Sequence, residues 1–249
     1  MATANPALND EIFLASPRSL SGAATDRMTV SGTVLKTSVL LVILLTAAGV
    51  TWTQATRGEA NMLFPLLIAG IIGGLVFAIA TIAFPKASPY TAPVYAGCEG
   101  LVLGAISVIM EARYHGIAVQ AAGLSVATLA AMLGLYASGL VRATARFRTG
   151  VLAATGAVAL VYLASMVMRL FGADMPFIHE ASPIGIGFSV VVVVIAALNL
   201  ILDFDTIETG VRLRAPKYME WYAGFGLLVT LVWMYLEILR LLAKLRGRD

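Results

Sequence analysis

Four acidic side chains lie inside long apolar stretches of this sequence: Glu99, Asp203, Asp205 and Glu237. A charged side chain at membrane depth costs about 2.5–3.5 kcal/mol on insertion scales, so such a residue usually faces a bundle interior, a partner or water. Two carboxylates on neighbouring helices can share a proton when they lie close together. Once deprotonated, they can repel each other or bind a hard cation such as Ca²⁺. These residue types therefore indicate a proton-sensitive cation pathway.

Glu237 shares one helical face with small or polar residues at spacings of three and four, namely Gly226, Thr230, Trp233, Arg240 and Lys244. A polar face on a membrane helix is expected to point inward. Arg240, one turn beyond Glu237, could bind the deprotonated carboxylate and act as a latch. The alternative is a local Glu237–Arg240 pair at the membrane interface that has no function.

Asp203 and Asp205 cannot share a face, because two residues turn a helix by about 200°. The face of Asp203 also carries Asn199, Thr206 and Gly210, which predicts an interior polar stripe. The face of Asp205 carries Glu208 and Arg212, which is typical of a solvated surface with salt-bridge spacing. Glu99 is either a third interior carboxylate or a residue that lines the mouth of the bundle.

Seven segments are long and apolar enough to position these residues in a bilayer, since a membrane helix needs about 20 such residues. They span residues 34–54, 63–84, 92–110, 117–139, 149–171, 184–207 and 218–243. Continuous apolar runs favour helices over barrel strands. The predicted fold is therefore all-α, a seven-transmembrane-helix bundle over 34–245 after a polar N-terminal arm at 1–33. Glycines four apart, at 70 and 74 and at 100 and 104, predict close helix packing.

The composition supports a membrane protein. Of the 249 residues 59% are hydrophobic and 12% are charged, and the mean hydropathy is +0.89. A soluble domain is about 45–50% apolar and about 25% charged, so this chain has too little charge to cover a soluble globule. Disorder and a disulfide scaffold are excluded, the latter because Cys98 is the one cysteine. No basic run is interleaved with aromatic residues, which argues against nucleic-acid binding.

Basic residues in the loops predict a cytoplasmic N-terminus. Ten lysines and arginines lie in the N-terminal arm and the loops on its side, and three (Arg57, Arg113 and Arg169) lie in the opposite loops. The C-terminal tail disagrees, because Arg240, Lys244, Arg246 and Arg248 would then lie outside. Either these cations snorkel into the outer interface, or the seventh segment is re-entrant and the tail is cytoplasmic.

Residues 28 to 245 resemble the Bax inhibitor-1 (transmembrane Bax-inhibitor-motif) family, in a bacterial, YccA-like branch. The motifs that carry the resemblance are Asp203-Phe204-Asp205-Thr206-Ile207 and Tyr235-Leu236-Glu237-Ile238-Leu239. The resemblance implies seven helices with the last one central, a multi-pass position in the bacterial inner membrane, and a pH-sensitive calcium leak through a pair of interior aspartates.

The sequence departs from the family pattern at that pair. Glu237 stands where the family has an aspartate, and the sixth-helix aspartate corresponds either to Asp205, if Asp-Thr is matched, or to Asp203, if Ile207 is matched. Glu237 also follows Asp205 by 32 residues. The pair can form only if residues 211–223 make an interfacial excursion before the seventh span.

The leading functional prediction is a pH-sensitive cation leak channel gated by interior carboxylates, with Ca²⁺ as the ion on the basis of the resemblance. Its expected partners are the lipid bilayer, protons and cations. The alternative is a non-conducting membrane regulator that binds other membrane proteins, such as a protease or its clients. An enzyme is not expected, since the sequence has no His-Glu-x-x-His, Gly-x-Ser-x-Gly or P-loop motif. Nothing indicates a cofactor or a defined metal site.

Overall fold

The computed structural model describes residues 27–57, 60–172 and 182–247, and in these residues every long element is a helix. The helices are α2 (Val30–Thr56), α3 (Leu63–Ala83), α4 (Ser88–Arg113), α5 (Ile117–Ala137), α6 (Ala145–Leu170), α7 (Pro183–Arg212) and α8 (Met219–Arg246). Short 3₁₀ turns, Ala60–Met62 and Pro85–Ala87, precede α3 and α4. All seven helices are long and apolar enough to cross a membrane, which confirms the predicted fold class. Most of the predicted N-terminal arm, residues 1–26, lies outside the described residues.

The helix boundaries differ from the predicted ones by a few residues for local reasons. Helix α2 begins at Val30, because the Thr29 side chain accepts a hydrogen bond from the Gly32 amide and caps the helix. Helix α4 begins at Ser88, four residues before the predicted span. Pro89 lies in its first turn, where a missing N–H breaks no helical hydrogen bond. Helix α7 continues past residue 207 to Arg212.

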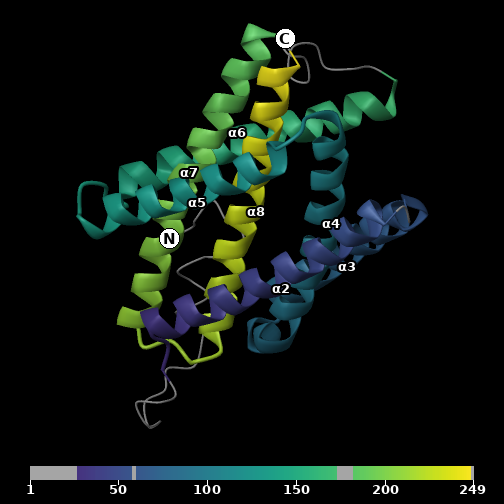
Figure 1. The fold of residues 1–249 in the computed structure, drawn as a ribbon. Helices are drawn as coiled ribbons and strands as arrows, with labels where there is room; N and C mark the ends of the chain where they lie inside the picture. Colours follow the sequence, from purple (N-terminus) through teal and green to yellow (C-terminus); the bar gives the residue numbers. More distant parts are fainter. Residues whose placement is uncertain (1–26, 58–59, 173–181, 248–249) are drawn as a thin grey trace.

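Helix α8 is the central helix of the bundle. It packs against α2, α4, α5 and α7, and it runs between a group formed by α2, α3 and α4 and a group formed by α5, α6 and α7 (Figure 1). Its most apolar stretch is 61% buried, compared with 17% for α6, which packs mainly against α7. This arrangement confirms the prediction that the last helix is central.

Glycines allow α2, α3 and α4 to approach closely. A Cβ atom added to Gly100 would lie 2.3 Å from the Leu44 carbonyl oxygen, and one added to Gly104 would lie 2.6 Å from the Ala48 carbonyl oxygen. On the other side of α4, a Cβ on Gly70 would lie 2.7 Å from the Cys98 carbonyl oxygen. No side chain fits at these positions, so the predicted packing role of these glycines is confirmed.

The start of α2 is fastened to the start of α8 by a set of contacts that we call the N-terminal clasp. The Met28 amide donates to the Ala215 carbonyl oxygen at 2.8 Å. The Thr29 amide and hydroxyl both donate to Glu220 Oε1, at 3.0 and 2.9 Å. Glu220 is only 1% exposed, so these donors satisfy a buried carboxylate. The clasp closes the end of the bundle at which α7 and α8 are joined.

Helices α7 and α8 form a plain antiparallel hairpin. Only residues 213–218 separate them, so the interfacial excursion required over 211–223 is absent. Helix α8 is also one unbroken helix of 28 residues, and a re-entrant seventh segment is therefore wrong. At the far end of the hairpin, Lys244 Nζ donates to the Gly185 carbonyl oxygen at 2.9 Å and to Ser189 Oγ at 2.8 Å.

Candidate functional site

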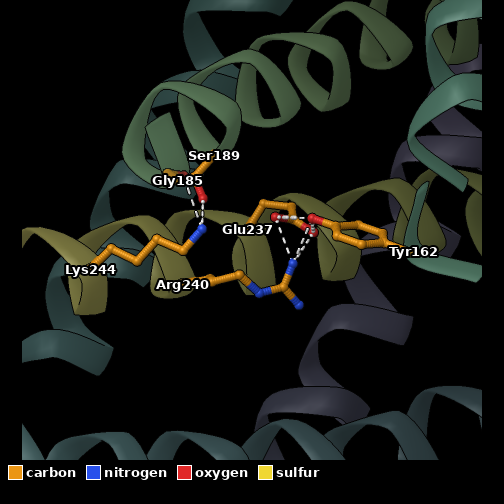
Figure 2. A network of polar contacts seen from close by, with 6 residues as sticks. All are labelled: Tyr162, Gly185, Ser189, Glu237, Arg240 and Lys244. Carbon is orange, nitrogen blue, oxygen red and sulfur yellow. Dashed lines mark hydrogen bonds and ion pairs between the residues drawn. The ribbon is translucent and has the colours of Figure 1, made fainter. Parts of the chain in front are cut away.

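Glu237, Arg240 and Tyr162 form a compact polar group, the Glu237 cluster, between α8 and α6 (Figure 2). Arg240 Nη1 donates to Glu237 Oε1 at 2.8 Å, to Glu237 Oε2 at 2.9 Å and to the Tyr162 hydroxyl oxygen at 2.6 Å. The Tyr162 hydroxyl lies 2.9 Å from both carboxylate oxygens of Glu237. The Glu237 side chain is 2% exposed and that of Arg240 is 40% exposed, so a buried carboxylate has a counter-charge that reaches toward the surface. The predicted contact between Glu237 and Arg240 is present.

Tyr162 belongs to a row of polar contacts along α6, which we call the polar seam. Arg148, Thr155 and Tyr162 are spaced by seven residues and so lie on one face of α6. Arg148 forms an ion pair with Asp205 of α7, and Thr155 Oγ1 accepts a hydrogen bond from Asn199 Nδ2 at 2.9 Å. The third position, Tyr162, contacts Glu237 and Arg240. Helix α6 is thus joined to α7 and α8 by one polar contact at every second turn.

Asn199 and Asp203 are buried, as their shared helical face predicts. Asn199 is 3% exposed and also donates to its own helix, to the Ile195 carbonyl oxygen at 2.8 Å. Asp203 is 1% exposed. The interior polar stripe of α7 is therefore confirmed as interior.

The hairpin does not bring Asp203 or Asp205 to Glu237. The contacts of Lys244 with Gly185 and Ser189 set the register, which places Glu237 opposite about residue 194 and Asp203 opposite about residue 228. At 1.5 Å per residue, Asp203 and Glu237 are about 13 Å apart along the helix axis. The proton-sharing pair is thus not formed in this structure, and the reason is the short α7–α8 connection.

Asp205 has a different partner from the ones that its helical face suggested. It pairs with Arg148 of α6, with the Asp205 side chain 17% exposed. Glu208 instead accepts a hydrogen bond from the Tyr136 hydroxyl at 2.5 Å, and Arg212 donates to Thr209. Asp205 is thus more exposed than Asp203, as expected, but its ion-pair partner is Arg148 of α6, and it does not lie on a fully solvated face.

Glu99 lies apart from the other carboxylates. It is half-buried on α4 and lines a cavity of about 270 Å³ between α3, α4 and α8, together with Tyr95 and apolar side chains. Across the cavity it faces Gly74 of α3, where an added Cβ would lie 3.4 Å from Glu99 Oε1. Glu99 therefore lines a cavity at the side of the bundle and takes no part in the Glu237 cluster.

The sequence did not predict the contacts that three of these polar residues make. Tyr162 could have been found from the seven-residue spacing of Arg148, Thr155 and Tyr162. Lys244 was placed on the inward polar face of Glu237 and in the basic tail, but its contact with α7 was not predicted, and it is 6% exposed. Nothing in the sequence indicated the contact of Glu220, because its partner Thr29 is 191 residues away in the chain.

The site has the chemistry of a protonation-sensitive contact rather than that of a metal centre. Among the described residues, no three histidine, cysteine, aspartate or glutamate side chains gather closely enough to hold a metal ion. The carboxylates of Glu237 and Asp205 are instead each matched by one arginine. Protonation of Asp205 removes an ion pair between α6 and α7, and protonation of Glu237 removes an ion pair within α8 whose carboxylate also holds Tyr162 of α6.

Comparison with known proteins gives one assignment. The model of a family described as Bax inhibitor 1 like matches residues 5–247, which is nearly the whole chain. A comparison with curated proteins and one with solved structures found no significant match. The match covers all seven helices and both of the acidic motifs that carry the sequence resemblance. The chain belongs to the Bax inhibitor 1-like family.

Proposed function

We propose that this protein is a pH-sensitive cation leak channel of the bacterial inner membrane, with Ca²⁺ as the permeating ion and the N-terminal clasp on the cytoplasmic side. The observation that carries the proposal is the buried Glu237 carboxylate on the central helix, with Arg240 and Tyr162 as its partners. Family membership supports the choice of a channel and of Ca²⁺. The Glu237 cluster holds the closed state.

Opening follows from the loss of one charge. Protonation of Glu237 leaves Arg240 without a counter-charge and leaves the Tyr162 hydroxyl without a charged acceptor. Because Tyr162 is the point at which α6 reaches α8, its release loosens α6 from the central helix. The polar face of α8 then becomes accessible to water and cations, and the remaining acidic side chains attract cations into it.

This mechanism gives the pH dependence a sign. The ion pair between Glu237 and Arg240 exists only while Glu237 is ionised, so the closed state is favoured at higher pH and lost as pH falls. A proton-sharing carboxylate pair would act in the opposite direction, since low pH would hold its two helices together. The direction of the pH response therefore separates the two mechanisms.

The test is Ca²⁺ flux into proteoliposomes of the purified protein between about pH 5 and about pH 8. We expect wild-type flux to rise as pH falls. Glu237→Gln carries no charge at any pH, so its flux should be high and independent of pH. Tyr162→Phe keeps the ring but loses the hydroxyl, and should leak more than wild type at the upper end of the range. Glu208→Gln is the matched control, because Glu208 is also bonded to a tyrosine, Tyr136, but lies outside the cluster.

Three results would contradict the proposal. If wild-type flux falls with acid, the gate is a proton-sharing pair formed in another conformation. If Glu208→Gln abolishes the pH response as Glu237→Gln does, the Glu237 cluster is not the sensor. If wild type passes no more Ca²⁺ than empty liposomes at any pH, the protein is not a channel, and the non-conducting membrane regulator takes its place.

A further inference from the structure

A cavity of about 460 Å³ lies between the C-terminal ends of α4 and α8. Its wall is formed by apolar side chains of both helices, which are Ile106, Met110, Leu236, Leu239 and Ala243. Its remaining lining includes the cationic residues Arg113, Arg240 and Lys244 and the ring of Tyr114. The cavity thus combines a wide apolar wall with a cationic rim, and no acidic residue lines it.

The positive charge of this rim is only partly compensated. Arg113 is exposed and, within the described residues, forms no hydrogen bond and no ion pair; its guanidinium lies 5.6 Å from the centroid of the Tyr114 ring. Arg240 uses one terminal nitrogen for Glu237 and Tyr162, and its other terminal nitrogen points away from them (Figure 2). Two guanidinium groups on neighbouring helices therefore have donors available for an anion.

The geometry points to an acidic phospholipid as the ligand. We propose that a phosphodiester headgroup lies between Arg113 and Arg240 and that its acyl chain follows the apolar wall formed by α4 and α8. Guanidinium groups match phosphate oxygens with paired hydrogen bonds. A soluble anion would meet the same cations but would leave the apolar wall in contact with water. Basic pockets between membrane helices recognise acidic headgroups in the same way.

The site also gives the basic end of α8 a role. Arg240, Lys244 and Arg246 lie at the end of the bundle whose loops carry few basic residues, where the charge distribution of membrane proteins predicts few cations. A bound acidic lipid would place negative charge beside the two of them that line the cavity, Arg240 and Lys244. This inference does not rest on the proposed channel activity, because lipid binding is measured without flux.

The experiment is native mass spectrometry of the purified protein in detergent, with phosphatidylglycerol or phosphatidylcholine added at equal concentrations. Wild type should retain phosphatidylglycerol in preference to phosphatidylcholine. Arg113→Gln removes an arginine that has no hydrogen bond or ion pair among the described residues, and should lower phosphatidylglycerol retention about five-fold, as expected for one cation at a lipid headgroup. Arg57→Gln is the matched control, an exposed arginine at the same end of the bundle but outside the cavity, and should retain lipid as wild type does.

A second variant tests the apolar wall. Ala243→Phe fills the cavity without changing any charge, so it should also lower phosphatidylglycerol retention, while helicity measured by circular dichroism reports whether both variants are folded. The inference is overturned if Arg113→Gln and Arg57→Gln lower retention equally, since the lipid would then respond only to surface charge. Displacement of the lipid by soluble glycerol phosphate would assign the site to a free anion instead.

Discussion

On one side of α8, helices α2 and α4 approach until the glycine backbones of α4 touch α2, whereas on the other side α6 is joined to α7 and α8 by the polar seam. Two glycines of α6, Gly150 and Gly156, have no atom within 4 Å of an added Cβ. Lipid tails are as apolar as leucine, so apolar contact alone gives membrane helices little reason to associate. One side of α8 is therefore held by close backbone packing, and the other side by polar contacts of individual side chains.

The largest effect is expected where the glycine side is disturbed. Gly100→Val would place its Cβ 2.3 Å from the Leu44 carbonyl oxygen and 2.7 Å from the Ala47 Cβ, and neither neighbour is a flexible side-chain end. Overpacking of this kind costs about 1–3 kcal/mol and more when backbone atoms must move. Thermal loss of helicity in detergent should occur at a clearly lower temperature. Gly49→Val on α2, where an added Cβ meets nothing within 4 Å, is the control, and equal stability of the two variants would show that the close approach is unimportant.

The ion pair of the polar seam should give the next largest effect. Asp205 and Arg148 have side chains 17% and 12% exposed, so Asp205→Asn leaves a largely buried guanidinium without its counter-charge. We expect a loss of about 2–3 kcal/mol in the free energy of unfolding, with a smaller additional loss in Asp205→Asn/Arg148→Gln. A double-mutant cycle in detergent measures the coupling. Strictly additive losses would mean that the two side chains do not act together.

The middle contact of the seam is neutral and should contribute less. Thr155→Val keeps the shape of the side chain but removes the acceptor of Asn199 Nδ2. Hydrogen bonds between membrane helices contribute about 0.6 kcal/mol on average and up to about 1.7 kcal/mol, and a loss in this range is expected. Thr149→Val is the comparison, since the Thr149 hydroxyl bonds only to its own helix, at the Ala145 carbonyl oxygen. A loss in Thr149→Val as large as in Thr155→Val would argue against an interhelical role.

The smallest effect is expected at Gly156 of α6. This glycine tests whether α6 lacks the close glycine packing that joins α2 and α4. An added Cβ there meets no atom within 4 Å, and alanine favours a helix over glycine by about 0.5–1 kcal/mol. Gly156→Ala should therefore be neutral or slightly stabilising in the same unfolding measurement. A marked destabilisation would mean that α6 packs as tightly as α2 and α4 do.

The number of helices and most of their limits could be predicted from the sequence, because the bilayer sets the length of each apolar segment. The packing glycines at 70, 100 and 104 could also be identified, because glycines four residues apart within one helix are visible in the sequence. The partners that polar side chains find on other helices could not be predicted. Helical faces show that Asp203 points inward and that Asp205 points elsewhere, but they do not show which helix lies opposite.

The expected pair of Glu237 with Asp203 or Asp205 is not formed, because it depended on the length of the turn between α7 and α8, which the sequence does not give. Once that turn is six residues long, the register of the hairpin separates the two carboxylates. The actual partners of Glu237 then come from α6, through Tyr162, and from its own helix, through Arg240. The contact within one helix could be predicted from spacing, and the contact between helices could not.

The N-terminal clasp has a consequence for the synthesis of the protein. Thr29 reaches its partner Glu220 only after a further 191 residues have been made. At about 5–20 residues per second, this contact forms no sooner than roughly 10 to 40 s after Thr29 has been made. During that interval the face of α2 that packs against α8 in the folded chain lacks that contact. The clasp therefore cannot close until most of the chain has been synthesised.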